Sequence, residues 1–227
     1  MRIEPLGDSG LIVRVSDQFD PETSLKAVLA AVGQLEAAAI PGLIELAPAY
    51  TTIGVFFDPA RSGGFEGLKT TIEHALRTSV EPARARAAAA TIEVPVCYEN
   101  EFAPDLGNVA QHTRLSSDEV IRRHSDATYR VACVGFTPGF PYLSGLPPEL
   151  ATPRRSSPRK EIPAGAVAIG GTQTGVYPRK SPGGWNIIGR TPLRLFDVQR
   201  ELPALFHTAD RVRFRQISRD EFDQFSI

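Results

Sequence analysis

The sequence contains little cysteine and no long apolar run. Among its 227 residues only Cys97 and Cys133 are cysteines, and they form no Cys-x-x-Cys pair. Both fall in expected strands, so we interpret them as buried reduced thiols rather than as a disulfide or a nucleophile. No run of about 18 apolar residues occurs, and the N-terminus has no apolar signal-peptide region. These absences argue against a disulfide-stabilised scaffold and a membrane span, and we expect a cytoplasmic protein.

Complete nucleotide and metal motifs are also missing. The nearest approach to a phosphate-binding loop is the stretch GGFEGLKT (63–70), in which Leu68 occupies a position that needs glycine. A side chain there would prevent the backbone from wrapping around a phosphate. The histidines show neither His-x-His nor His-x-x-x-His spacing, so we expect no metal to be bound by this chain alone.

Residues 1–80 are expected to form a small α+β domain of order ββαββα. The predicted elements are strands at 2–5 and 11–15, a helix from Asp20, strands at 43–46 and 53–57, and a helix from Phe65. Asp20 suits the N-cap position and Pro21 the first helical position. Apolar residues then recur at helical spacing, which predicts helices on one face of an antiparallel sheet.

Residues 81–90 are interpreted as a linker, although their alanines could extend a helix. Residues 91–227 are expected to form a second, mainly-β domain that closes as a barrel. The predicted elements are strands at 91–98, 129–136, 166–169, 193–196 and 212–214, helices at 105–112 and 116–124, and a terminal helix. Ser116 and Glu119 make the S-x-x-E capping box that marks the start of the second helix.

The stretch 135–192 is rich in turn residues and in positive charge. It holds 10 of the 19 glycines and 10 of the 19 prolines, interleaved with aromatic and branched apolar residues. A disordered segment lacks such apolar residues, so we predict short strands joined by defined loops. Eight Lys and Arg residues lie between Thr152 and Arg194 against one acidic residue, Glu161. Guanidinium groups beside glycine-rich backbone match carboxylates and phosphates, so this stretch predicts an anion site; the alternative is a solvated basic face.

Several residues are candidates for this chemistry. Arg154 and Arg155 suit the carboxylate of a substrate, because the prolines around them stiffen the backbone. We interpret Arg179 and Lys180 as a solvated tip. The hydroxyl of Ser181 could bind an oxyanion together with backbone N–H groups. The full set of candidate substrate- or anion-binding residues is Arg154, Arg155, Tyr142, Thr174, Tyr177, Gly183, Gly184 and Arg190.

Three further positions carry alternative interpretations. His124 is a candidate general acid or base, or else a structural partner of a helix C-terminus. Gln173 and Thr174 follow a strand of small apolar residues and are candidate polar groups at the mouth of the barrel, or else Thr174-Gly175 is the turn of a tight hairpin. Trp185 suits the core better than a ligand platform.

Four motifs in this stretch resemble the signature of the bacterial 5-oxoprolinase B-subunit family: GFTPGFPYL (135–143), ATPRR (151–155), PAGAVAIGGTQTGVYP (163–178) and SPGGWNIIGRTP (181–192). Weaker matches extend over nearly the whole chain. That family includes the histidine-kinase inhibitor KipI and is related to the carboxyltransferase region of urea carboxylase.

The resemblance implies a cyclophilin-like β-barrel after the α+β domain, and an enzyme that opens 5-oxo-L-proline to L-glutamate with ATP. It implies two partners, a barrel protein like the C subunit of 5-oxoprolinase and a third protein like its A subunit, and ATP with Mg held by the complex. His124, Gln173 and Ser181 are then the candidate catalytic residues. The alternatives are inhibition of a sensor histidine kinase and one half of a biotin-dependent carboxyltransferase. A fold alone does not decide among these functions.

Overall fold

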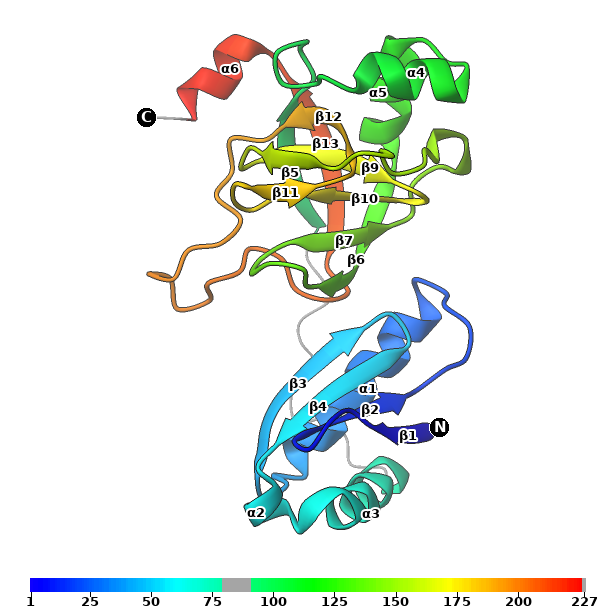
Figure 1. Cartoon of the computed structure of the whole chain (residues 1–227), viewed down its shortest axis with the longest axis vertical. Coiled ribbons are helices and arrows are strands. Elements are labelled where there is room, and N and C mark those ends of the chain that lie inside the picture. Colours follow the sequence, from blue (N-terminus) through cyan, green and yellow to red (C-terminus); the bar gives the residue numbers. More distant parts are fainter. Residues whose placement is uncertain (79–90, 226–227) are drawn as a thin grey trace. The chain divides into compact units, whose positions relative to one another are not determined.

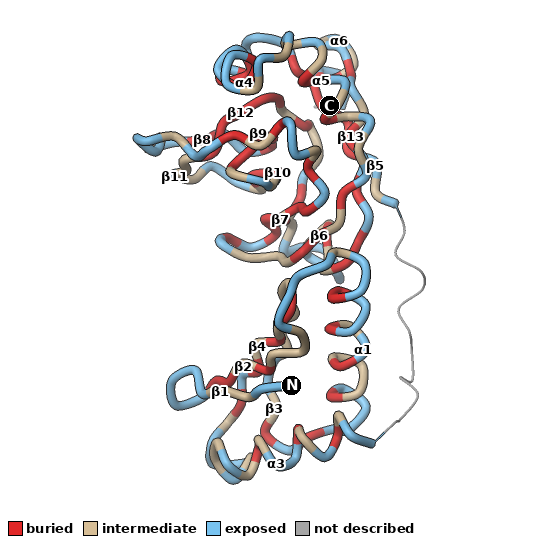
Figure 2. Tube along the Cα trace, turned by 90° about the vertical axis from the view of Figure 1, so that its right-hand side faces the viewer, coloured by how far each residue is buried: buried red, intermediate tan, exposed pale blue. Residues whose placement is uncertain are grey.

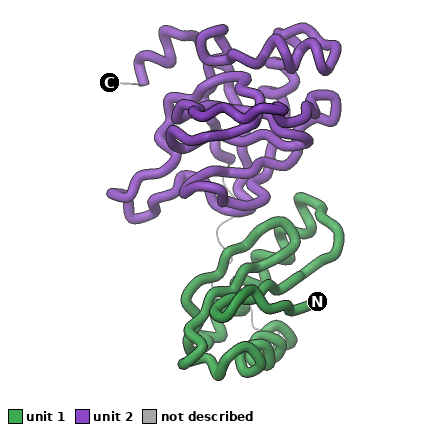
Figure 3. Tube along the Cα trace, viewed as in Figure 1, with its two compact units in different colours: residues 1–89 green, residues 90–227 purple. Residues whose placement is uncertain are grey.

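The computed structural model describes residues 1–78 and 91–225 of the chain, so the linker predicted at 81–90 lies outside the described residues. The chain divides into two compact units, residues 1–89 and 90–227 (Figure 3). A separate hydrophobic cluster lies in each unit. Whether the two units fold independently stays a prediction.

The first unit has the predicted order of strands and helices (Figure 1). Its elements are β1 (Arg2–Pro5), β2 (Gly10–Arg14), α1 (Thr23–Ala37), β3 (Leu43–Ala49), β4 (Thr52–Phe57), α2 (Pro59–Ser62) and α3 (Gly64–Arg77). The strands pair antiparallel in the order β1-β2-β4-β3. The second predicted helix, from Phe65, corresponds to α3, and the short helix α2 before it was not predicted. Gly63 adopts a left-handed conformation with φ of 75° and ends α2.

Helix α1 begins two residues later than predicted, and its N-cap is Glu22 instead of Asp20. The Asp20 carboxylate accepts hydrogen bonds from the backbone N–H groups of Glu22 and Thr23 at 3.1 and 2.7 Å, in the turn before the helix. Pro21 therefore precedes the helix instead of starting it. The predicted apolar stripe is buried at Leu25, Val28 and Leu35, with exposed fractions of 1% or less, and half-buried at its other two positions, Leu29 and Val32.

The second unit contains a closed barrel and three helices in its described part (Figure 1). Its elements are β5 (Thr91–Cys97), α4 (Leu106–Thr113), α5 (Ser117–Asp126), β6 (Thr128–Val134), β7 (Pro141–Ser144), the 3-10 turn η1 (Pro148–Leu150), β8 (Arg159–Ile162), β9 (Ala166–Gly170), β10 (Gln173–Val176), β11 (Ser181–Gly183), β12 (Asn186–Arg190), β13 (Arg211–Ile217) and α6 (Arg219–Gln224). The barrel order is β10-β7-β6-β13-β5-β12-β9, with β8 and β11 pairing separately. The chain thus has a mixed α and β fold.

Two local predictions can be compared with this unit. The Ser116 hydroxyl accepts a hydrogen bond from the Glu119 N–H and caps α5, as the capping box predicts. The strand predicted at 193–196 is wrong. Its backbone pairs instead within its own loop, through Leu205 N to Leu195 O and Asp197 N to Pro203 O, both at 2.8 Å.

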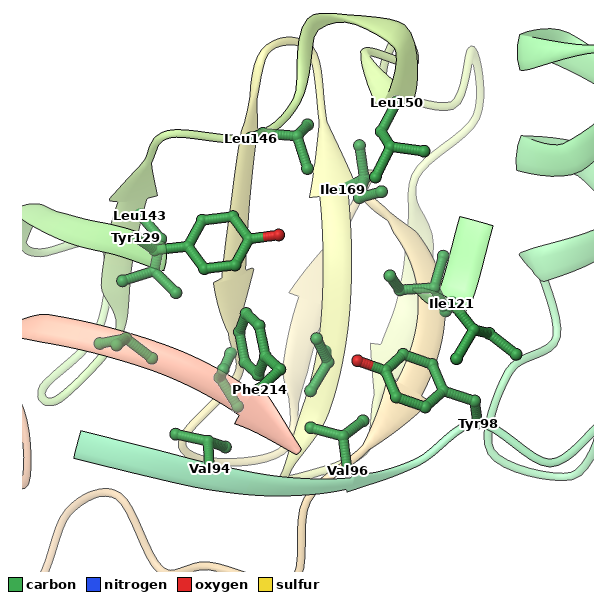
Figure 4. Packing of buried hydrophobic residues seen from close by; sticks show 14 of the residues in the cluster. Val94, Val96, Tyr98, Ile121, Tyr129, Leu143, Leu146, Leu150, Ile169 and Phe214 are labelled. Carbon is green, nitrogen blue, oxygen red and sulfur yellow. The ribbon is translucent and has the colours of Figure 1, made fainter. Parts of the chain in front are cut away.

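The inner face of the barrel is a packed core. Figure 4 shows Tyr98, Tyr129 and Phe214 pointing into it among branched apolar side chains. Strand β9 is buried on both faces (Figure 2), because Val167 and Ile169 face the interior while Ala168 packs on the outer side against a second cluster that includes Trp185. The outer cluster lies next to the candidate site.

The predictions of buried reduced thiols and of no membrane span can also be compared with the structure. Neither cysteine forms a disulfide. Cys97 is buried in β5 as predicted, whereas Cys133 is only half-buried in β6. In the described ranges, every helix is too short or too polar to cross a membrane.

Candidate functional site

Six side chains on the outer side of the barrel form one cluster, which we term the Arg154 face: Phe136, Phe140, Tyr142, Arg154, Tyr177 and Trp185. The guanidinium carbon of Arg154 lies 5.7 Å from the centre of the Trp185 ring. Trp185 in turn meets the rings of Phe140 and Tyr142 edge-on, at 5.6 and 5.9 Å. This geometry places an exposed cation over an aromatic ring, an arrangement that orients the cation and stabilises its charge.

Glycine is required beneath this face for reasons of space. The Trp185 ring lies directly on Gly170, where a Cβ would fall 2.5 Å from ring atoms. At Gly175 a Cβ would lie 2.8 Å from the backbone oxygen of Pro141 and 2.9 Å from the Phe140 ring. The glycines of this stretch therefore serve ring packing here, in addition to any exposure of backbone N–H groups.

Arg154 and Arg155 have different environments, although they are adjacent in the sequence. Arg155 donates to the carboxylate of Asp105 at 2.8 Å, and Arg159 donates to both oxygens of the same carboxylate at 2.7 and 2.9 Å. The Asp105 side chain is 1% exposed. An internal carboxylate thus binds Arg155 through Nη1, whereas the Arg154 side chain is exposed to solvent.

Much of the positive charge of the basic stretch is compensated. Arg155 and Arg159 pair with Asp105, Lys180 with Glu161 and Arg194 with Asp197. Within residues 1–78 and 91–225, the cations of this stretch without a carboxylate partner are Arg154, Lys160, Arg179 and Arg190. Arg154 is the member of this set that belongs to the aromatic cluster around Trp185.

The two tyrosines of the Arg154 face are neutral hydrogen-bonding groups. Burial raises the pKa of Tyr177 to about 12, and the backbone N–H of Trp185 partly opposes that rise. Burial also raises the pKa of Tyr142, while the positive charge of Arg154 acts in the opposite direction. Both hydroxyls therefore keep their protons at neutral pH and are potential donors. Tyr142 is half-buried, whereas Tyr177 is buried with an exposed fraction of 2%.

Strand β11 lies beside this face and carries the predicted residues Ser181 and Gly183, with Gly184 directly after it. The hydroxyl of Ser181 is buried and has no hydrogen-bond partner in the described part of the chain, which makes it a candidate donor. Gly183 packs under Tyr177, since a Cβ there would fall 2.4 Å from the Tyr177 hydroxyl. The carbonyl of Gly184 accepts from the N–H of Arg155 at 2.7 Å, so this backbone is fixed to the arginine loop.

His124 and Thr174 lie together inside the barrel, with exposed fractions of 0%. The imidazole is bonded to the hydroxyls of Tyr98 at 2.9 Å and Thr174 at 3.0 Å, and it stacks on Phe214 at 4.5 Å. Burial lowers the pKa of His124 to about 3. This position supports the structural interpretation of His124 and gives no support to a role as acid or base.

The hairpin alternative for Thr174 and Gly175 is wrong. Both residues lie within β10, paired with Ile169 and Ala168 of β9, and the turn before them is formed at Gly171. Thr174 faces the interior and donates to the carbonyl of Ala168 at 3.0 Å. Gln173 is half-exposed at the start of β10, opposite Gly170.

Arg190 belongs to a different place from Arg154. Its guanidinium lies over the rings of Phe102 and Phe222 at 5.6 and 6.0 Å, and its Nε donates to Ala164 O. It lines a cavity of about 270 Å³ together with Arg159 and Glu161. The structure therefore joins Tyr142, Arg154 and Tyr177 in one cluster, with Ser181, Gly183 and Gly184 on the neighbouring segment, and separates His124, Thr174 and Arg190 from them. Of the other two candidates, Arg155 is paired with Asp105 and Gln173 begins β10.

Sequence reasoning missed two residues of this site. Asp105 was expected only as the start of a helix, and Phe136 only as an apolar residue of the stretch. The signal for Asp105 is weak, because its arginine partners lie 50 and 54 positions away. Phe136 could have been singled out by its place between turn residues, in the sequence Gly-Phe-Thr-Pro-Gly.

Comparison with known proteins identifies the family. Residues 1–206 match the family model of the carboxyltransferase domain, subdomain C and D. The B subunit of 5-oxoprolinase from Bacillus subtilis (strain 168) is 41% identical over 233 residues, which cover 99% of this chain and 96% of that protein. The chain belongs to the carboxyltransferase subdomain C and D family and, within it, to the 5-oxoprolinase B-subunit family.

Two solved structures resemble the chain. The crystal structure of TTHA0988 is 37% identical with a TM-score of 0.78, over 92% of this chain but only 40% of that one. The conserved uncharacterized protein PH0987 from Pyrococcus horikoshii is 40% identical with a TM-score of 0.57, over 97% of this chain and 100% of its own. This chain thus spans about two fifths of the length of TTHA0988.

Proposed function

We propose that this chain is one component of an ATP-dependent 5-oxoprolinase, which opens 5-oxo-L-proline to L-glutamate and is active only with its partner subunits. The observation that carries the proposal is the 41% identity to a 5-oxoprolinase B subunit over 99% of this chain. The Arg154 face supports it, because an exposed guanidinium beside two neutral phenols suits a small carboxylate. We also infer that the barrel is of the cyclophilin-like type and that the protein is cytoplasmic.

The reaction needs activation of a stable amide. In the proposed sequence, the γ-phosphoryl group of ATP passes to the carbonyl oxygen of the lactam and leaves ADP. Water then adds to that carbon and the ring C–N bond breaks, which gives the free amine and an acyl phosphate. A second water hydrolyses the acyl phosphate to L-glutamate and inorganic phosphate. Cations must screen the phosphate charge, and donors must meet the developing oxyanion.

This chain can supply part of that machinery. We assign the substrate carboxylate to Arg154, with Tyr142 and Tyr177 as donors beside it. Ser181, whose buried hydroxyl is unpaired in the described ranges, is the candidate donor to the oxyanion, with Gln173 as a second polar group. We keep His124 outside this set because both of its ring nitrogens are already hydrogen-bonded in the core.

ATP and Mg are proposed to be held by the complex rather than by this chain. Within the described residues, no group of three His, Cys, Asp or Glu side chains is placed to hold a metal ion. The Arg154 face is also open to water, where charge stabilisation is weak. A barrel protein like the C subunit and a third protein like the A subunit would cover this face and supply the remaining groups.

The test is 5-oxo-L-proline-dependent ATP hydrolysis, measured with the purified chain alone and then with the two partner subunits. We expect no turnover by the chain alone and robust turnover by the reconstituted complex. Formation of L-glutamate should match the ADP released. Robust turnover by the single chain would contradict partner dependence, and its absence in the complete mixture would contradict the function.

One half of a biotin-dependent carboxyltransferase is the second candidate, because the matching family model describes a carboxyltransferase domain. The sequence contains no Met-Lys-Met biotin-acceptor context, so a carrier would have to be another protein. Transfer of labelled carboxylate from carboxybiotin to an amide substrate, in the absence of ATP, would favour this alternative.

A further inference from the structure

Phe136 combines two features that do not stabilise the free chain. Its backbone lies in the left-handed region with φ of 65°, which is a genuine outlier for a bulky residue. Its side chain is 62% exposed. A glycine or asparagine would adopt the same backbone with less strain, and a polar side chain would meet water more favourably.

The loop between β6 and β7 holds Phe136 in this conformation. Gly135 N donates to Phe140 O at 3.1 Å, Phe140 N to Thr137 O at 3.0 Å, and Thr137 N to Gly135 O at 2.7 Å. Gly139, with φ of 83°, packs so closely on Phe196 that a Cβ would fall 2.8 Å from the Phe196 Cβ. Strain of this kind persists where the surroundings fix the backbone, and it is concentrated at functional sites.

The ring of Phe136 stands at the edge of the Arg154 face. It meets Phe140 edge-on at 5.5 Å and Tyr177 at 6.3 Å. Phe140 in turn meets Trp185 at 5.6 Å, and the Arg154 guanidinium lies over Trp185 at 5.7 Å, so the exposed ring and the exposed guanidinium belong to one aromatic cluster. An exposed apolar ring and an exposed cation in one cluster suit a ligand that has a carboxylate and an apolar ring.

We propose that Phe136 is a specificity-determining residue: its exposed ring packs on the apolar ring carbons of the cyclic substrate whose carboxylate Arg154 receives. The inference rests on the proposed function and goes beyond it, because it assigns recognition of the ring to a residue outside the charged set. The same arrangement discriminates against open-chain carboxylates, which reach Arg154 but leave the Phe136 ring uncovered.

The first test concerns the free chain. Phe136→Gly and Phe136→Asn should unfold at a urea concentration equal to or above that of the wild type, because both residues tolerate positive φ. A residue with a merely structural role would lower the midpoint when truncated. Phe136→Tyr serves as the conservative control, since it keeps the ring.

The second test concerns the ligand, in the complex reconstituted with both partner subunits. The KM for 5-oxo-L-proline should rise about tenfold in Phe136→Gly and Phe136→Asn and stay within about twofold in Phe136→Tyr and in Lys180→Gln, a control at an exposed side chain paired with Glu161. Acetate, which has a carboxylate and no ring, should compete equally well against substrate in the wild type and in the Phe136 variants. Arg154→Gln should weaken both ligands.

The outcomes separate this inference from the proposed function. A wild-type complex without turnover overturns the proposed function and this inference with it. A wild-type complex that turns over, with Phe136 variants that keep the wild-type KM, overturns the inference alone. The inference is also overturned if the Phe136 variants lose stability and weaken inhibition by acetate as strongly as they raise the KM for 5-oxo-L-proline. The ring would then serve only packing.

Discussion

The imidazole of His124 is part of a closed chain of hydrogen bonds in the barrel interior. Thr174 donates to the Ala168 carbonyl, so its oxygen accepts from Nε2 of His124 and leaves Nδ1 to accept from Tyr98. Tyr129 adds a bond to the His124 carbonyl at 2.8 Å. Every polar group in this set is satisfied when the imidazole is neutral, which is why burial disfavours its protonated form.

This burial predicts a pH dependence of stability. The pKa of His124 falls from an ordinary 6.5 to about 3 in the folded chain, so the neutral form is the one that the fold stabilises. The contribution is fully present above pH 6.5 and is lost as the pH falls toward 3, with a limiting slope of about 1.4 kcal/mol per pH unit. His124→Gln, which does not titrate, should be less stable at pH 7 but show a flatter profile.

Urea unfolding between pH 7.5 and 4.5 measures this difference. Acidic groups with lowered pKa, such as Glu119, lose their contribution mainly below their ordinary values, so the interval above pH 4.5 isolates the histidine. Profiles of equal slope for the wild type and His124→Gln would contradict the assignment.

Among the structural elements, the loop before β8 depends on one carboxylate. Asp105 precedes α4 and accepts from Arg155, from Arg159 and from the backbone N–H of Ile187 at 2.8 Å. Its own N–H donates to the Ile187 carbonyl at 3.0 Å. Asp105 therefore joins the arginine loop to β12, two residues beyond Trp185.

Removal of this charge should destabilise the second unit. Asp105→Asn leaves two partly buried guanidinium groups sharing a neutral side chain, and breaking a buried ion pair costs about 3–5 kcal/mol. The arginines are 26% and 31% exposed, so water recovers part of this and we expect a loss of about 2–4 kcal/mol.

The matched control is Glu161→Gln, which breaks the exposed pair with Lys180 and should cost roughly 0–1 kcal/mol. Urea unfolding of the three proteins at one pH measures both values. Equal losses for the two variants would contradict the special role of Asp105.

Local signals predicted most elements, and they failed where contacts are distant in sequence. Capping residues and apolar spacing placed α1, α5 and β5 correctly to within a few residues. The sequence does not distinguish the roles of Arg154, Arg155 and Arg159, because no local signal tells which of these side chains turns toward Asp105. The exposed cation of the site, Arg154, therefore became distinguishable from Arg155 only once the fold brought α4 beside that loop.

At the scale of the whole molecule, each unit has a main hydrophobic core of its own within the described residues. The first is built by β2, β4, α1 and α3, the second by the barrel strands with α4 and α5. The family model runs across both units, from residue 1 to residue 206. The pattern that defines the family therefore includes both units, and the candidate site described above lies on the second.

We predict that each unit folds on its own. The motivation is that the buried residues of each cluster come from one unit, so neither core needs the other to exclude water. Trypsin has cleavage sites at Arg84 and Arg86, which lie in the sequence between the described ranges 1–78 and 91–225. Limited digestion should release two resistant fragments near 1–84 and 87–227, and each should unfold cooperatively in urea. Digestion that begins in 135–192 or at the termini, or a fragment 1–84 that is unfolded after separation, would show instead that the chain folds as one cooperative body.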